Sequence, residues 1–301
     1  MDLVLTLVSA PDKARLEPAL LAEIAAALSR AGAKVAAPLW LDPAIACDLA
    51  FGGIEASHAQ NIAMAMLGGE AVDCYAQGAG GRKKRLLLCD MDSTIVTAET
   101  LDDLSVFAND KAEIDALTQK SIAGEMNFTQ SLIARVALLK GLTEAEFAAA
   151  YLKVEVSPGA ETLIRTLRRD GCYTALVSGG FRYFTSRVAA RVGFDIDISN
   201  DFEMADGKTT GKLMPPIVDP DGEFGKLGRL RHLAKECGID LSAAAAIGDG
   251  SNDIPMLSAA GMGCGYRGKP KVKAATGCQL NYANLTGLLF YMGYRRDEFV
   301  T

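Results

Sequence analysis

Two carboxylates stand two residues apart in the stretch Asp90-Met91-Asp92-Ser93-Thr94, which follows the apolar run 86–89 directly. On an extended segment, residues two apart project to the same side. Core packing has no use for two neighbouring acids at the end of a buried strand, because an unpaired buried charge costs several kcal/mol. The pair therefore indicates a divalent cation combined with acid chemistry.

Asp90 and Asp92 suit two different steps of a displacement at phosphorus. Asp90, at the end of the strand, could attack phosphorus and form an aspartyl-phosphate, which divides one hard displacement into two easier ones. Asp92 could protonate the leaving oxygen and later deprotonate water. The structural alternative is a helix N-cap, since Asp, Ser and Thr all cap helices well. Asp-x-Asp alone does not decide between the two interpretations.

A second acidic stretch, Gly248-Asp249-Gly250-Ser251-Asn252-Asp253, follows the buried run 243–247. Asp249 could ligate a hard cation together with Asp90. Mg²⁺ fits because it uses few carboxylates and accepts phosphate oxygens. Asn252 could orient a phosphate, and Asp253 could support the ligands from behind. A loop with Asx turns is the alternative, which the position directly after a buried strand disfavours.

Ser178 and Gly179 stand where a strand is expected to pass into a helix. Ser178 could donate a hydrogen bond to a phosphate, and Gly179 would let the backbone approach it closely. An ordinary strand-to-helix turn with a serine cap explains the same residues. Taken by itself, this segment favours the ordinary turn.

Lys226 precedes the helical pattern 227–237 and could reach a phosphoryl oxygen as a point charge. A solvated surface lysine is the alternative. Lys208 and Lys212 compete for the same role, but their Gly- and Thr-rich segment is typical of an exposed hairpin. We therefore expect Lys226 to be the functional lysine.

From residue 82 onward, strand and helix patterns alternate, which predicts a parallel sheet. The carboxyl edge of such an open sheet is where ligands bind. A long helical stretch, about 98–155, is expected to form a cap over that edge, and Asp206-Gly207 predicts a hairpin within a small β insertion over 202–224. The expected strands are 86–89, 173–177, 194–198 and 244–247.

Residues 1–80 form a separate βαββαβ pattern, which suits a small antiparallel α+β domain with its helices on one face. This order resembles an ACT-type regulatory domain. The glycine-rich segment 77–81 is typical of a linker, so we expect domains at 1–80 and 81–301. The basic cluster 82–85 is interpreted as a solvated lead-in to the next strand. The expected strands are 3–8, 34–39, 45–51 and 71–76, and the expected helices are 16–31 and 58–67.

Composition favours a soluble enzyme. The 301 residues are 50% hydrophobic, enough for a full core, and the net charge of −6 argues against nucleic-acid binding. Seven cysteines without a Cys-x-x-Cys pair indicate reduced thiols in the cytoplasm, and two histidines disfavour a His-based zinc site. The start lacks a basic leader, and no apolar run approaches the ~18 residues of a membrane span.

In this order, the segments around Asp90, Ser178, Lys226 and Asp249 resemble the four motifs of the haloacid dehalogenase superfamily of phosphohydrolases. The resemblance covers roughly residues 82–280. It implies a Rossmann-like α/β core with a helical cap inserted after the first strand. It also implies a Mg²⁺-dependent phosphatase, whose expected metal ligands are Asp90, Asp92 and Asp249.

Two further patterns resemble the phosphoserine phosphatase family within that superfamily. Its first motif, Asp-x-Asp-Ser-Thr, has a glutamate seven residues after the second aspartate, which is Glu99 here. Its cap carries an arginine in Phe-x-x-Ser-Leu-x-x-Arg-Val, matched by 128–136 with Arg135. Phosphoserine carries an ammonium and a carboxylate, so Glu99 would take the first and Arg135 would grip the second. Met126 and Phe128 would supply an apolar lid.

The resemblance implies hydrolysis of O-phospho-L-serine to L-serine and phosphate, the last step of serine biosynthesis. Many members carry an ACT-like domain ahead of the catalytic unit. Ligand-binding ACT domains usually have glycine in the turn after the first strand, but 9–13 has none. A structural or homodimerising role therefore fits better than effector binding. The alternatives are a phosphatase or phosphotransferase for another small metabolite, and a non-catalytic amino-acid sensor working through residues 1–80.

Overall fold

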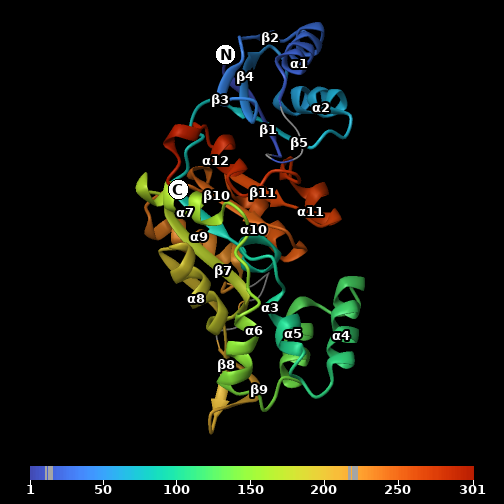
Figure 1. Ribbon diagram of the computed structural model, residues 1–301, viewed down its shortest axis with the longest axis vertical. Coiled ribbons are helices and arrows are strands. Elements are labelled where there is room, and N and C mark those ends of the chain that lie inside the picture. The colour runs from blue at the N-terminus through green and yellow to red at the C-terminus, as the bar shows by residue number, and fades with distance from the viewer. Residues whose placement is uncertain (11, 13–15, 216–217, 219–222) are drawn as a thin grey trace.

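The computed structural model describes residues 1–10, 12, 16–215, 218 and 223–301, and Figure 1 shows its arrangement. Two separate sheets organise the described chain, one of five strands near the N-terminus and one of seven strands. The predicted fold class, a parallel α/β core with a helical cap and a small N-terminal α+β part, is confirmed. The division at residue 80 and the likeness to an ACT domain stay predictions.

The N-terminal sheet is antiparallel, in the order β2-β4-β1-β5, with β3 also paired to β4. Helices α1 and α2 pack their apolar sides on it. The single strand expected over 34–39 was wrong. It is two strands, because Pro38 lies between them and has no N–H for the ladder. The elements are β1 (Leu3–Ser9), α1 (Pro18–Arg30), β2 (Lys34–Val35), β3 (Leu39–Asp42), β4 (Ala46–Gly52), α2 (Ala56–Leu67) and β5 (Val72–Gly78).

The larger sheet has the order β12-β11-β10-β6-β7-β8-β9, parallel except for β9, which runs antiparallel to β8. The four predicted strands are present. The short, glycine-containing β11 and the three-residue β12 were not predicted. The strands are β6 (Leu86–Cys89), β7 (Tyr173–Phe181), β8 (Ile196–Ala205), β9 (Lys208–Met214), β10 (Ala244–Gly248), β11 (Met262–Tyr266) and β12 (Cys278–Leu280).

The hairpin predicted at Asp206-Gly207 joins β8 to β9, and both turn residues have positive φ angles, +50° and +74°. This combination is typical of a tight hairpin turn. The hairpin lies between Ser178 and Lys226, where the β insertion was predicted, and its first strand continues a strand of the main sheet. Within the segment expected at 202–224, residues 216, 217 and 219–222 lie outside the described residues.

Both faces of the larger sheet are covered by helices. Leu86 and Leu88 of β6 pack in one apolar cluster with α9–α11, while Leu87 and Cys89 pack in another with α7, α8 and α12. Burial on both sides explains why the strand is apolar throughout, without alternation. The helices are α7 (Ala160–Arg169), α8 (Arg182–Val192), α9 (Lys226–Glu236), α10 (Ile254–Ala259), α11 (Pro270–Ala275) and α12 (Gly287–Tyr291), with short helical turns at Met91–Ile95, Leu241–Ala243, Ser251–Asp253 and Arg296–Glu298.

Four helices between β6 and α7 form the cap, and α4, α5 and α6 lie at the lower end of Figure 1, next to the end of the sheet formed by β8 and β9. The chain enters and leaves the cap through paired segments. Val96 and Val156 form an antiparallel bridge, and the Thr97 N–H donates to the Glu155 carbonyl at 2.9 Å. The cap helices are α3 (Thr100–Ser105), α4 (Lys111–Ala123), α5 (Phe128–Ala137) and α6 (Glu144–Tyr151).

The basic cluster 82–85 fastens the linker instead of pointing freely into solvent. A guanidinium nitrogen of Arg82 lies 2.7 Å from Asp48 of β4, and Lys83 Nζ lies 2.8 Å from Glu298 near the C-terminus. Lys84 Nζ donates to the Ser242 carbonyl at 2.8 Å. The interpretation as a solvated lead-in was therefore wrong for Arg82 and Lys84, which are half-buried, whereas Lys83 and Arg85 are exposed. In the described ranges, none of the helices combines the length and apolar character needed to cross a membrane.

Candidate active site

The predicted motif segments meet at the carboxyl edge of the larger sheet. Asp90 directly follows β6 and Asp249 directly follows β10, its parallel neighbour. The Asp90 N–H donates to the Ile247 carbonyl at 2.9 Å, which fixes the two strand ends against each other. Ser178 lies in β7, on the other side of β6, and Lys226 begins α9.

Asp90 is held by one of its carboxylate oxygens. Oδ1 accepts the Met91 N–H at 2.7 Å and lies 2.5 Å from Lys226 Nζ. The same Nζ lies 2.5 Å from Oδ1 of Asp253, and Lys226 is only 3% exposed. Lys226 is therefore a buried counter-ion shared by two acids, and the alternative of a solvated lysine is wrong. Oδ2 of Asp90 has no hydrogen bond within the described ranges, which leaves it available for attack.

Three buried carboxylates, those of Asp90, Asp249 and Asp253, each offer an oxygen within 4.8 Å of the others. Burial raises the pKa of Asp90 to about 6, against the lowering effect of Lys226. Burial, and then the charge of Asp90, likewise raise the pKa of Asp253 to about 6. Oxygen donors with excess negative charge are what a hard divalent cation requires. The donor set fits such a cation. Asp253 lies within the carboxylate cluster, whereas the sequence predicted that it would stand behind the ligands and support them.

Asp92 is bound to a different set of donors. Its Oδ1 accepts the Thr100 N–H at 2.9 Å, and its Oδ2 accepts the Ser178 hydroxyl at 3.3 Å. The Ser178 hydroxyl in turn accepts the Gly180 N–H at 2.8 Å. Burial first, and then the charge of Glu99, raise the pKa of Asp92 to about 7. A carboxyl with this pKa can both donate and accept a proton near neutrality. The role of Asp92 as a metal ligand stays a prediction.

The turn after β6 brings Glu99 to this site. Ser93 has a positive φ of +55°, which is uncommon for a residue other than glycine. Its N–H donates to the Ala98 carbonyl at 3.1 Å, and its hydroxyl donates to Oε1 of Glu99 at 2.8 Å. The acids that start the turn and the glutamate that ends it are thus parts of one folded unit.

The cap supplies Phe128 and Arg135, both on α5. The ring of Phe128 lies over Gly179, in keeping with the apolar lid predicted for it. Arg135 is half-buried and donates to the Ser131 carbonyl at 3.3 Å and to the Thr118 hydroxyl at 3.4 Å. Burial lowers the pKa of Arg135, while Asp102 and Glu99 act in the opposite direction.

Asn252 is half-buried in the turn Ser251–Asp253, where its Oδ1 lies so close over Gly250 that a Cβ on that glycine would stand 2.4 Å away. Gly250 also donates its N–H to Oδ2 of Asp253 at 2.9 Å. The turn is therefore closely packed around its own side chains. The contact of Asn252 with a phosphate stays a prediction.

Sequence reasoning missed Lys269. Its Nζ lies 3.0 Å from Oδ2 of Asp249 and 3.8 Å from Oε1 of Glu99. Burial opposes its charge, but Asp249 and Glu99 outweigh burial and raise the pKa of Lys269. The usable signal was Lys269-Pro270 at the carboxyl end of a parallel strand, but β11 itself had not been predicted.

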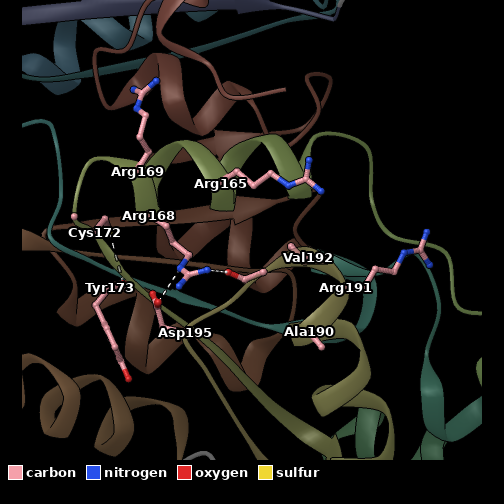
Figure 2. Close-up of a pocket in the computed structure, with 11 residues that line it drawn as sticks. Arg165, Arg168, Arg169, Cys172, Tyr173, Ala190, Arg191, Val192 and Asp195 are labelled. Atoms are coloured by element: carbon pink, nitrogen blue, oxygen red, sulfur yellow. Dashed lines mark hydrogen bonds and ion pairs between the residues drawn. The ribbon is translucent and has the colours of Figure 1, made fainter.

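A surface hollow of about 750 Å³ lies away from these acids, and Figure 2 shows the side chains around it. It is lined by the start of β7 and the ends of α7 and α8, at the opposite edge of the sheet. Arg168 there donates to the Gly193 carbonyl at 2.8 Å and to Asp195 at 2.7 Å. Arg168 and Arg169 stand in the last turn of α7, where a positive charge is stabilised by the helix dipole. The hollow lies at the other edge of the sheet and is not part of the candidate site.

Residues 87–258, more than half of the chain, match the model of a protein family described as "haloacid dehalogenase-like hydrolase". The chain belongs to the haloacid dehalogenase-like hydrolase family. The matched range runs from β6 through the cap to α10, and so contains every predicted site residue of this family member. The N-terminal sheet lies outside it.

Several characterised proteins are similar to this haloacid dehalogenase-like hydrolase. A phosphoserine phosphatase of Streptomyces coelicolor is 36% identical over 85% of this chain and 62% of its own length. Phosphoserine phosphatase SerB2 of Mycobacterium tuberculosis is 39% identical over 76% of this chain and 54% of its own length. The chain thus spans less than two thirds of these relatives. The crystal structure of a haloacid dehalogenase family hydrolase of Salmonella enterica has a TM-score of 0.82 and 25% identity, and covers 96% of this chain and 98% of its own.

Proposed function

We propose that the protein is a Mg²⁺-dependent phosphatase that hydrolyses O-phospho-L-serine to L-serine and phosphate. The observation that carries the proposal is the tether between the Asp90–Asp92 turn and Glu99 through the Ser93 hydroxyl, at 2.8 Å. It puts a carboxylate for an ammonium group beside the acids for phosphoryl transfer. The names of the two relatives above support the same substrate.

In the first step, Oδ2 of Asp90 attacks phosphorus in line with the serine oxygen. The bond from phosphorus to that oxygen breaks as the aspartyl-phosphate forms, and Asp92 gives its proton to the leaving oxygen. Lys226 offsets negative charge on the phosphoryl oxygens. The pKa of about 7 for Asp92 supports this role, because a useful fraction is protonated at neutral pH.

In the second step, the deprotonated Asp92 takes a proton from water, which attacks the aspartyl-phosphate. Phosphate leaves, and Asp90 is regenerated with Asp92 protonated again. The Ser178 hydroxyl, now hydrogen-bonded to Asp92, and the N–H groups around Gly179 are suited to hold phosphoryl oxygens. The cycle balances without any further reactant.

A divalent cation would be held by Asp90, Asp249 and Asp253, with Asp92 as a further predicted ligand. Bound there, Mg²⁺ would neutralise phosphoryl oxygens and so lower the barrier to attack. The cluster is suited to it because all three residues are buried, with at most 5% of the residue surface exposed. They offer oxygen alone, the donor that Mg²⁺ prefers.

Substrate recognition would divide between the turn and the cap. Glu99 is half-exposed, so one of its oxygens can accept the ammonium while Oε1 stays on Ser93. Arg135 could grip the carboxylate bidentately. Phe128 would close over the substrate and exclude water.

The free state of all seven cysteines supports the proposed cytoplasmic location, and homodimer formation through residues 1–80 stays a prediction.

Phosphate release from a panel of phosphomonoesters tests the proposal, with Asp90→Asn as the control. We expect kcat/KM for phosphoserine to exceed that for simple alkyl phosphates by about 100-fold or more. Asp90→Asn should lower kcat by about 1,000-fold or more. Equal rates across the panel would reject the substrate. A phosphorylated alcohol in place of free phosphate would reject simple hydrolysis in favour of transfer.

A further inference from the structure

The backbone of Lys269 is fixed beside the acid cluster. Its N–H donates to the Asp249 carbonyl at 2.9 Å, and Pro270 follows it as the first residue of α11. A residue before proline is restricted to extended backbone, and Lys269 has a ψ angle of 158°. The side chain therefore starts from a defined point next to Asp249.

The Lys269 side chain lies beside the carboxylates of Asp249 and Glu99. In the proposed function these two carboxylates bind other cations. Nζ of Lys269 lies 3.0 Å from Oδ2 of Asp249 and 3.8 Å from Oε1 of Glu99. Asp249 would hold the divalent cation, and Glu99 would hold the substrate ammonium. An ammonium group already present at both carboxylates opposes the arrival of each, because like charges repel.

Lys226 and Lys269 differ in their freedom to leave. The side chain of Lys226 is 3% exposed and is enclosed between Asp90 and Asp253, so it cannot reach water. The side chain of Lys269 is 61% exposed. It can swing into solvent at small cost, since exposed ion pairs are weak.

We propose that Lys269 is a competing cation, whose ammonium group shares Asp249 with the divalent cation and Glu99 with the substrate ammonium. It thereby sets how strongly the site binds both. The inference rests on the cation site of the proposed function. It predicts the direction in which the affinity for Mg²⁺ changes when Lys269 is replaced. Removal of a competitor tightens binding, whereas removal of a supporting lysine loosens it.

Calorimetric titration of Mg²⁺ into chelator-treated protein, at constant ionic strength, tests that sign. We expect Lys269→Ala to lower the Kd about three- to fivefold, in line with a partly exposed ion pair. Lys269→Arg keeps the charge and should stay within about twofold of wild type. Lys271→Ala, at an exposed lysine inside α11, is the matched control and should leave the Kd unchanged.

An unchanged or raised Kd in Lys269→Ala would overturn the inference. If that variant unfolds, Lys269→Gln, which keeps much of the stem, gives the same test. A wild-type protein that binds no Mg²⁺ would instead reject the proposed cation site itself. On the substrate side, Lys269→Ala should increase the preference for phosphoserine over 3-phosphooxypropanoate, which lacks the amine. A reduced preference would show an orienting lysine and overturn competition at Glu99.

Discussion

The ring of Phe128 lies so close over Gly179 that a Cβ built on the glycine would stand 2.6 Å from the ring carbon Cζ. Phe128 begins cap helix α5, whereas Gly179 lies in β7 of the sheet. The absence of a side chain at position 179 is therefore what lets the cap approach the sheet. In this respect Gly179 acts as a contact point for the cap, in addition to its predicted role beside the phosphate.

Gly179→Ala should hold the cap away from the sheet and lower kcat/KM for phosphoserine by about tenfold or more, because misplacement by about 1 Å is costly in a closed site. Thermal unfolding should change little, since Phe128 is only half-buried and can move. Steady-state kinetics and calorimetry check the two effects. Phe128→Ala in the same chain should make the Gly179→Ala effect smaller. An effect of equal size in both backgrounds would assign Gly179 to phosphate contact alone.

Gly248→Ala should destabilise the fold by about 1–3 kcal/mol, the usual cost of an overfilled core. The new Cβ would stand 2.4 Å from the carboxyl carbon of Asp253, which is held by Lys226 and cannot withdraw. Urea denaturation measures the loss. Gly52→Ala is the matched control, because Gly52 also ends a strand but its Cβ would meet nothing within 4 Å. Equal losses in the two variants would contradict the packing argument.

Most of the acid site could be predicted because each acid follows a buried strand directly. Asp90 and Asp249 end neighbouring parallel strands, so their proximity follows from the order of the sheet. The place of Asp253 could not be predicted. Its carboxylate enters the cluster only because the 3₁₀ turn Ser251–Asp253 bends the chain back over Gly248.

The sequence did not predict the position of Lys269 or the division of the second strand, and the two misses have different causes. A five-residue strand such as β11, with glycine at two positions, has too little β-propensity to stand out from a loop. Its end could therefore not be placed beside β10. Pro38 did carry a signal against a continuous strand over 34–39, but the apolar pattern outweighed it.

Glu99→Gln should shift the alkaline limb of the kcat/KM profile to lower pH. Asp92 must be protonated to act as the acid, so activity falls as pH rises through its pKa of about 7. Burial is the main cause of that raised pKa and the Glu99 charge is the second. Removal of the charge therefore makes ionisation easier and lowers the pKa. The measurement uses an alkyl phosphate without an amine, so that loss of ammonium binding does not contribute.

Asp102→Asn, at an exposed carboxylate on α3, is the control for this profile and should leave the limb in place. An alkaline limb that does not move in Glu99→Gln would mean that a group other than Asp92 controls it. A shift to higher pH would contradict the electrostatic argument directly.

Asp73→Ala should weaken the junction between the two sheets. Asp73 of β5 is 4% exposed, and its carboxylate accepts three backbone N–H groups of 281–283, after β12, at 2.8–2.9 Å. Hydrogen bonds to a charged group contribute about 1.5–3 kcal/mol each when a partner is removed, so we expect a loss of at least about 2 kcal/mol.

Urea denaturation followed by fluorescence of Trp40, the single tryptophan, reports the N-terminal sheet, and circular dichroism reports the whole chain. We expect the Trp40 transition to move to lower urea than the transition of the whole. Asp42→Asn, which removes only a 3.9 Å ion pair to Arg296, should leave both transitions together. Coincident transitions in Asp73→Ala, unchanged from wild type, would show that the junction does not depend on this carboxylate.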